Sequence, residues 1–156
     1  MLLLDGLCVS FMNQDSQTCD QSESGVKQGA VAVIKDGDKF LSIKRAQSVS
    51  FPGKICFPGG RVEPGETVEQ ALVREMQEEL GIAVRPVRLI WKSISARGFE
   101  LNWCTAEIKT GEVVSPDQSE VESFEWLTQS EMMANPDLLS SNGDFFEALQ
   151  RCEFEI

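Results

Sequence analysis

The feature that most constrains this chain is the segment 57–82, FPGGRVEPGETVEQALVREMQEELGI, in which a loop rich in glycine and proline leads into an amphipathic stretch. Thr67 followed by Gln70 fits the capping box that starts a helix, and Gly81 lies where helices often end in a left-handed residue. We therefore expect a helix over Val68–Leu80. Any fold of the chain must hold a tight loop directly before this helix.

The predicted helix carries three glutamates side by side. At about 100° per residue, Glu75, Glu78 and Glu79 share one arc beside the apolar stripe that contains Leu72 and Met76. Like charges at this spacing cost a few tenths of a kcal/mol per pair on an isolated helix, which we expect something to offset. Mg²⁺ prefers carboxylate and carbonyl oxygens, so the trio predicts a metal site; the alternative is an ordinary solvated charged face.

The residues around the trio fit a supporting role. Arg74 precedes the cluster and Glu66 lies at the helix entrance, so we interpret them as a charge-assisted ion pair that holds the loop onto the helix. Gly59, Gly60 and Gly65 permit a close backbone approach that a Cβ would block, which would let a carbonyl reach the ion.

The rest of the chain indicates one mixed α/β domain. We expect a hairpin of 30–34 with 40–44 around Asp36-Gly37-Asp38, and a mixed sheet with a helix on each face. A long ordered loop is expected on both sides of a short apolar piece, 55–57. Further strands are expected in 82–95, 98–108 and 123–127, and helices in 128–134 and 143–152, with breaks at Asn135-Pro136 and Asn142-Gly143.

Length and composition set the domain organisation. A chain of 156 residues with 42% hydrophobic content is the size of one domain with one sizeable core. Residues 13–25 are polar, so we expect 1–26 to form a mobile N-terminal arm and 27–156 to form a single domain with a C-terminal helical segment. The apolar start, MLLLDGLCVSF, is too short for a membrane span and has no positive leader of a signal peptide.

Charge and cysteine content exclude several classes of partner. The net charge of −11 argues against binding a nucleic acid polymer or an anionic membrane, because both attract basic patches. The five cysteines are odd in number and form no CxxC pair, and no histidine could complete a zinc site. We read them as reduced thiols of a cytoplasmic protein.

The spacing within the opening segment is typical of one enzyme family. Its fixed positions match the Nudix box throughout, and the chain resembles the Nudix hydrolases from about residue 27 to 133. The resemblance implies an α/β/α sandwich around a mixed β-sheet, and Mg²⁺- or Mn²⁺-dependent hydrolysis of a nucleoside diphosphate linked to another group. The matching positions are Gly60, Glu66, Arg74, Glu75, Glu78, Glu79 and Gly81, with aliphatic Met76 and Ile82.

The resemblance also implies roles for individual residues. Glu75 and Glu79 match metal ligands, Glu78 matches a ligand or near-ligand, and the carbonyl of Gly59 matches a backbone ligand. Glu66 and Arg74 match the pair that orients the site. The family is divided between a general base inside the box and one on a later loop; Glu75 is our first choice, and the loop candidates are Glu120 and then Glu122, whose alternative reading is ordinary exposed acids.

The group linked to the diphosphate is approached by elimination. The chain has no tyrosine, which the diadenosine polyphosphate subgroup carries, and Ala96 and Arg97 stand where the ADP-ribose subgroup carries a proline. Val49 replaces an arginine of the coenzyme A subgroup. A nucleoside triphosphate or a nucleotide sugar remains as the expected small-molecule substrate.

Basic and aromatic residues near the box are candidates for substrate contacts. We expect phosphate contacts from Lys44, Arg45, Lys54 and Arg61, with ordinary surface charge as the alternative. Phe99, Trp91 and Trp103 could stack on a base, although aromatic residues on strands are more often core. A homodimer is left open, and the competing function is a nucleotide-sensing module without turnover.

Overall fold

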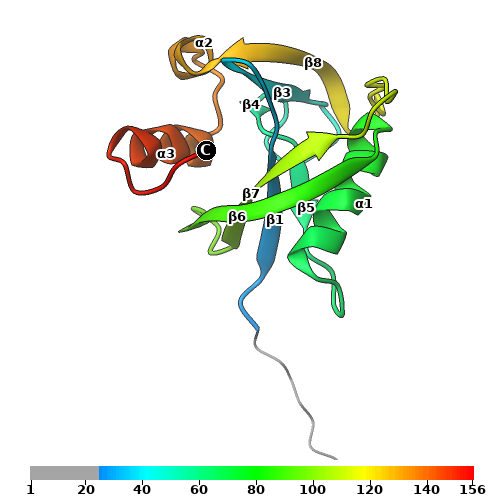
Figure 1. The fold of residues 1–156 in the computed structure, drawn as a ribbon, viewed down its shortest axis with the longest axis horizontal. Coiled ribbons are helices and arrows are strands. Elements are labelled where there is room, and N and C mark those ends of the chain that lie inside the picture. The colour runs from blue at the N-terminus through cyan, green and yellow to red at the C-terminus, as the bar shows by residue number, and fades with distance from the viewer. Residues whose placement is uncertain (1–24) are drawn as a thin grey trace, which may run out of the picture.

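The computed structural model describes residues 25–156, so nearly all of the arm predicted for 1–26 lies outside the described residues. The described part forms two four-stranded sheets and three helices (Figure 1). The strands are β1 (Gln28–Val33), β2 (Lys35–Asp36), β3 (Lys39–Arg45), β4 (Ile55–Cys56), β5 (Gly59–Arg61), β6 (Val84–Ile94), β7 (Glu100–Ile108) and β8 (Val121–Thr128), and the helices are α1 (Val68–Leu80), α2 (Gln129–Ala134) and α3 (Ser140–Gln150).

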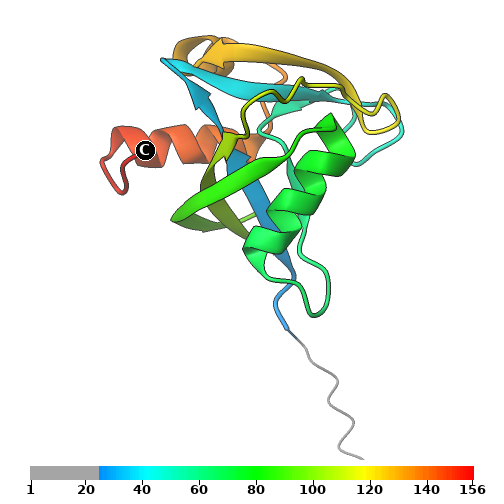
Figure 2. The same cartoon turned by 45° about the vertical axis from the view of Figure 1, so that its right-hand side comes forward.

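The first sheet is mixed and lies between two helices. Its order is β5-β1-β7-β6, with β1 parallel to β7 and the other pairs antiparallel. Side chains on a strand alternate between faces: Ala30 and Ala32 of β1 pack on the side of α1, while Val31 and Val33 pack with Phe145 of α3. Figure 2 shows α1 and α3 on opposite sides of this sheet. The predicted α/β/α sandwich with a mixed sheet is confirmed.

Helix α1 has the predicted bounds for the predicted reasons. The Thr67 hydroxyl accepts a hydrogen bond from the backbone N–H of Gln70, and the Gln70 side chain accepts one from the N–H of Thr67. Gly81 ends the helix at φ 63°, where its N–H donates to the carbonyl of Gln77. These local contacts fix where the helix begins and ends, and therefore where its glutamates lie.

The predicted hairpin is wrong beyond its turn. The pairing at the turn is limited to β2 with β3, through Lys35 with Phe40 and Asp36 with Lys39, and to one hydrogen bond from the N–H of Leu41 to the carbonyl of Ile34. The preceding strand β1 leaves for the mixed sheet, where it pairs with β5 and β7, and β3 pairs instead with β4 and β8. Because β1 is apolar on both faces, it buries more surface in the centre of a covered sheet than at the edge of a hairpin.

The predicted break at Asn142-Gly143 is also wrong, whereas the one at Asn135-Pro136 is confirmed by the end of α2. Asn142 and Gly143 both lie inside α3. The buried Asn142 side chain accepts a hydrogen bond of 2.8 Å from the N–H of Phe57. Burial of Phe145 and Phe146 offsets the cost of about 1 kcal/mol for a glycine within a helix.

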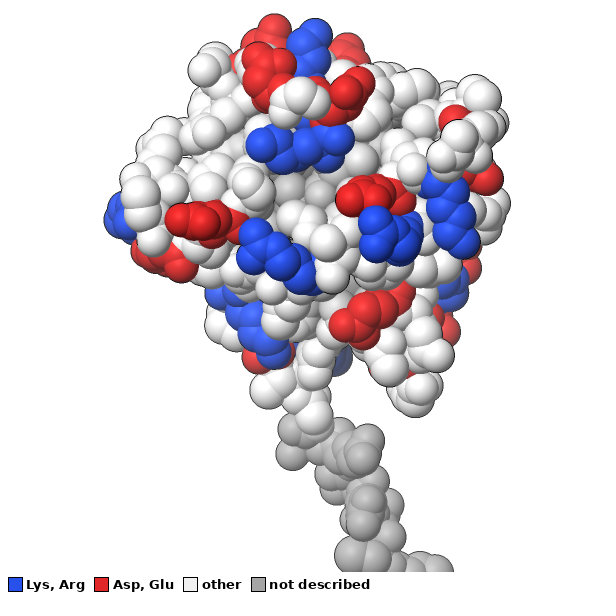
Figure 3. Space-filling view, viewed as in Figure 1, with Lys and Arg blue, Asp and Glu red and all other residues white. Residues whose placement is uncertain are grey.

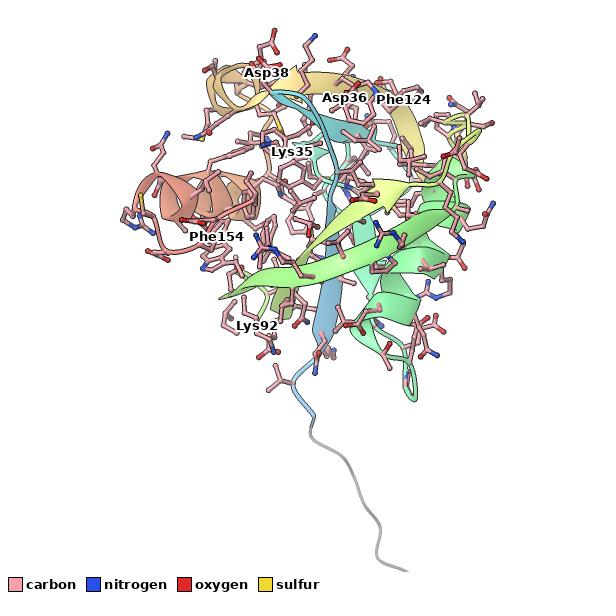
Figure 4. The ribbon with its side chains drawn as sticks, viewed as in Figure 1. Lys35, Asp36, Asp38, Lys92, Phe124 and Phe154 are labelled. Carbon is pink, nitrogen blue, oxygen red and sulfur yellow. The ribbon has the colours of Figure 1, made fainter. Side chains whose placement is uncertain are left out.

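An aromatic cluster joins α3 to the mixed sheet. Phe145 stacks on Trp103 with ring centroids 4.7 Å apart, and Phe154 stacks on Trp91 at 5.4 Å. Figure 4 shows Phe154 beside α3, from which it folds back toward the sheet. Trp103 is fully buried, and its indole N–H donates to the Ser93 hydroxyl. Both tryptophans therefore belong to the core and are not free to stack on a base.

The surface charge, the cysteines and the helices can be compared with the predictions made from charge and cysteine content. On the face shown in Figure 3, basic and acidic side chains are interspersed, so the excess negative charge forms no single patch there. Among residues 25–156, Cys56 and Cys104 are buried free thiols and Cys152 is an exposed one; Cys8 and Cys19 lie outside the described residues. Over the same residues, the helices are too short or too polar to cross a membrane.

Candidate active site

Three carboxylates converge beside the mixed sheet. Glu75 and Glu79 project from one face of α1, and Glu120 comes from the loop before β8. Each offers an oxygen atom, and these three atoms all lie within 4.8 Å of one another. Glu75 and Glu79 are buried and Glu120 is half-buried. We call Glu75, Glu79 and Glu120 the acidic cluster.

The loop that carries Glu120 is attached to the end of α1. The N–H of Asp117 donates to the carbonyl of Glu79 at 2.9 Å, and the N–H of Ser115 donates to that of Leu80 at 2.8 Å. On the other side, the N–H of Ala46 donates to the carbonyl of Glu120. The last carbonyls of a helix need partners, and by supplying them this loop places Glu120 next to the two helical carboxylates.

Arg74 holds the surroundings of the cluster through all five of its side-chain N–H groups. It binds Glu66 with two bonds of 2.9 Å, so the expected ion pair is present and bidentate. It also donates to Glu75 at 2.8 Å, to Glu78 at 3.0 Å and to the carbonyl of Arg61 at 2.9 Å. The hydrogen bond from Arg74 lowers the pKa of Glu66. Loop and helix are thereby joined at one guanidinium.

Glu78 lies apart from the other two glutamates of the predicted trio. Its side chain is 51% exposed, and Arg74 is its recorded partner. The cluster in the structure therefore takes its third carboxylate from Glu120 of the later loop. Glu122, the other loop candidate, pairs with Lys44 at 2.7 Å.

Two glycines let β5 approach its neighbours, Gly60 toward α1 and Gly59 toward β1. A Cβ on Gly60 would lie 2.2 Å from the Glu75 carboxylate, and one on Gly59 would lie 2.2 Å from the carbonyl oxygen of Ala30. Gly59, at φ 149°, donates its N–H to the Glu79 carboxylate at 3.0 Å. The contact recorded for Gly59 is thus through its N–H, and a role for its carbonyl as a metal ligand stays a prediction.

The electrostatics of the cluster call for a cation. Burial raises the pKa of Glu79 to about 8, and the N–H of Gly59 and the field of Arg45 offset this only in part. Burial also raises the pKa of Glu75, against the hydrogen bond from Arg74. Oxygen ligands brought together in this way suit a hard divalent ion, which would replace mutual repulsion by coordination. The donor set therefore fits Mg²⁺ or Mn²⁺.

A cavity of about 320 Å³ opens on the other side of Gly59 and Gly60, which line it. Of the predicted phosphate contacts, Arg45 and Arg61 line this cavity. Lys54 is absent from the lining and lies 3.5 Å from Asp137, to which it donates a hydrogen bond.

Several lining residues were not identified from the sequence. Phe99 was a candidate for base stacking and lies in the wall as expected, but Phe51, Arg97 and Asn142 were missed. The place of Arg97 in a turn between two strands, next to Gly98, is the signal that could have identified it. Asn142 gave no such signal because it was read as a helix breaker.

Comparisons with known proteins identify the family. Residues 26–149 match the family model of the NUDIX domain. The chain is 44% identical over 66 residues to the 8-oxo-dGTP diphosphatase of Escherichia coli, covering 42% of this chain and 51% of that protein. It is 32% identical over 112 residues to a NAD-capped RNA hydrolase of Stutzerimonas stutzeri, covering 68% of this chain and 38% of that protein. The chain thus spans about half or less of these relatives.

The fold has relatives among solved structures. The crystal structure of a MutT protein from Methanosarcina mazei superposes with a TM-score of 0.67, at 22% identity, over 81% of this chain and 94% of that one. At this identity the likeness establishes the fold alone.

Proposed function

The chain belongs to the NUDIX domain family and is a Nudix hydrolase, and on this premise we propose that it hydrolyses a nucleoside triphosphate or a nucleotide sugar at the diphosphate. The observation that carries the proposal is the convergence of Glu75, Glu79 and Glu120 beside an arginine-lined cavity. The Escherichia coli relative is an 8-oxo-dGTP diphosphatase, and because 8-oxo-dGTP is a nucleoside triphosphate, this similarity supports the first of the two substrate classes.

The acidic cluster is proposed to hold Mg²⁺ or Mn²⁺, with the Gly59 carbonyl and Glu78 as outer candidates. When bound, such an ion lowers the pKa of water and neutralises phosphate charge. The residues of the chain orient the site: Arg74 fixes the orientation of Glu75, and Glu66 fixes that of Arg74. Glu66 and Arg74 are positioning residues in this account.

The general base is proposed to be Glu75 or Glu120. Arg74 donates to Oε1 of Glu75, which leaves Oε2 free to accept a proton from water. Glu120 reaches the same place from the loop before β8. Comparing Glu75→Gln with Glu120→Gln at saturating Mg²⁺ identifies the base as the residue whose loss costs more kcat. Equal small losses would mean that neither acts alone.

Arg45 and Arg61 are proposed to contact the phosphates of the substrate. Both line the cavity, and neither forms an ion pair with a carboxylate among residues 25–156. Lys54 has a smaller part, since Asp137 already binds its ammonium group. Free nucleotides in the cytoplasm are the proposed substrates, rather than nucleic acid polymers or membrane surfaces, and a homodimer stays a prediction.

A nucleotide-sensing module without turnover is the competing function. The acidic cluster favours an enzyme, because a sensor needs no set of carboxylates placed to hold a divalent ion at the diphosphate. Phosphate release from a panel of nucleoside triphosphates and nucleotide sugars with Mg²⁺ decides between the two. Turnover that disappears in Glu79→Gln supports the enzyme, and tight binding without turnover of any member supports the sensor.

A further inference from the structure

The wall of the cavity is positively charged, although the chain as a whole is acidic. Its lining contains three arginines, Arg45, Arg61 and Arg97, and no aspartate or glutamate. The chain carries 25 acidic against 14 basic residues, so an arginine has many carboxylates available to it. Within the described part, the three cavity arginines form no ion pair, as is also true of Arg88 outside the cavity, whereas Lys44, Arg85 and Lys92 are paired. What distinguishes the three is that they line one cavity together.

Arg97 is held at the mouth of the cavity by a ring. Its guanidinium lies 4.2 Å from the ring centroid of Phe51, at a distance where a cation and an aromatic face attract each other. Arg61 lies in the same way over Phe99, at 5.6 Å. Stacking occupies the flat face of a guanidinium and leaves its N–H groups free at the edge, where they can donate to two oxygens of one phosphate.

The two segments that meet in this contact are both ordered by their own hydrogen bonds. The turn 95–99 is closed by the N–H of Ser95, which donates to the carbonyl of Phe99, and by the N–H of Gly98, which donates back to the carbonyl of Ser95. In the loop 46–54, the N–H of Lys54 donates to the carbonyl of Phe51, and Phe51 adopts φ 55°, a left-handed conformation that a bulky residue rarely adopts. This strained backbone presents the ring of Phe51 to Arg97 across the cavity mouth.

We propose that Arg97, supported by Phe51, is a specificity-determining residue that binds a further phosphate of the substrate, beyond the diphosphate that is cleaved. The inference rests on the proposed function and chooses between its two substrate classes. A nucleoside triphosphate offers this additional charge, and a nucleoside diphosphate joined to an uncharged sugar does not. The enzyme therefore favours the triphosphate.

The test compares Arg97→Gln with wild type on one nucleoside triphosphate and one nucleotide sugar whose sugar is uncharged. Loss of a charge-assisted contact should lower kcat/KM for the triphosphate about tenfold, mainly through KM, and leave the nucleotide sugar within about twofold. Phe51→Leu should act in the same direction by a smaller factor. Arg85→Gln, which removes an exposed arginine outside the cavity, is the matched control and should change neither substrate.

Two results would overturn the inference. An equal loss on both substrates would mean that Arg97 contacts the shared diphosphate or only ties the loops together. No loss on the triphosphate would mean that Arg97 does not touch the substrate. A thermal unfolding curve of each variant identifies any loss that comes from misfolding.

A binding experiment separates this inference from the proposed function. Calorimetry with Mg²⁺ and either inorganic tripolyphosphate or pyrophosphate requires no turnover. Wild type should bind tripolyphosphate more tightly than pyrophosphate, and Arg97→Gln should lose that preference. If no nucleotide is hydrolysed, the proposed function fails while this comparison still decides whether Arg97 selects the longer polyphosphate; equal binding of both by wild type would refute it.

Discussion

The two sides of the Gly59–Gly60 segment carry opposite charge and are built from different elements. On the side of α1, three carboxylates meet at a helix whose neighbours are fixed by Arg74. On the cavity side, three arginines come from the end of a strand, a sheet edge and a turn, and none has a carboxylate partner in residues 25–156. A metal ion bound to a polyphosphate would satisfy both sides at once, so each side is incomplete by itself.

The largest expected effect tests whether the acidic side is needed for catalysis. Glu79→Gln should lower kcat by about two to four orders of magnitude at saturating Mg²⁺, because it removes a metal ligand. The fold should persist, because glutamine has nearly the same size as glutamate and removes only a buried charge. Steady-state kinetics and thermal unfolding measure the two effects. Glu69→Gln, an exposed change on the first turn of the same helix, is the control, and comparable activity in the two variants would contradict the assignment.

The close packing at the boundary between the two sides can be tested by adding a methyl group at Gly60. Gly60→Ala places a Cβ against the Glu75 carboxylate, so Glu75 must move or β5 must shift. We expect about a tenfold to hundredfold loss of kcat, with a loss of about 1 to 3 kcal/mol in the free energy of unfolding.

Gly143→Ala is the matched control for that change. Nothing lies within 4 Å of a Cβ at this position in α3, and alanine is the better helix former. This variant should keep its activity and gain up to about 1 kcal/mol of stability. If Gly60→Ala behaved like Gly143→Ala, the close packing of β5 on the cluster would not matter for catalysis.

The smallest expected effect concerns pH. Without metal, Glu79 in the folded state has its pKa raised to about 8 from an ordinary value of 4.5, so the folded state binds more protons than the unfolded state between these values. Stability must then fall as pH rises through that window. With Mg²⁺ the trend should reverse, because the ion binds deprotonated carboxylates.

Unfolding midpoints between pH 5 and 8.5, with chelator and with Mg²⁺, measure this reversal, which we expect to be roughly a few degrees. Glu79→Gln provides the reference, since it should flatten both curves. Parallel pH trends with chelator and with Mg²⁺ in the wild type would indicate that no cation binds at the cluster.

The acidic side was largely accessible from the sequence because its signals are local. The capping residues and Gly81 gave the bounds of α1, and the spacing of 75 and 79 placed two carboxylates on one face. The pairing of Glu78 with Arg74 is local as well, because the two residues lie at i and i+4 on one helix, but the metal-site interpretation of the glutamate trio passed over it. Glu120 was named only as one of two loop candidates, because the contacts of its loop with α1 are nonlocal.

The cavity side was largely missed for the same physical reason. Phe51 and Arg97 come from loops far apart in the chain, and only the fold brings them together. The hairpin was misread because a turn signal does not show how far pairing continues, and β1 found better burial in another sheet. Local rules succeed where one helix sets the geometry, and they fail where packing between distant segments sets it.

The hydrogen bonding of Arg74 separates the catalytic site from the part of the cavity wall that is proposed to contact the substrate. Every N–H of that side chain is already engaged, by two loop groups and two glutamates of its own helix, so it has no spare donor with which to follow changes elsewhere. The segment 95–99 contributes no acceptor to it and is closed by hydrogen bonds among its own residues, whereas the segment 46–54 also holds the loop of Glu120 through Ala46 and Ser48. Replacing the segment 95–99 alone should therefore leave the hydrolytic apparatus intact, and substrate range could be engineered there separately from reactivity.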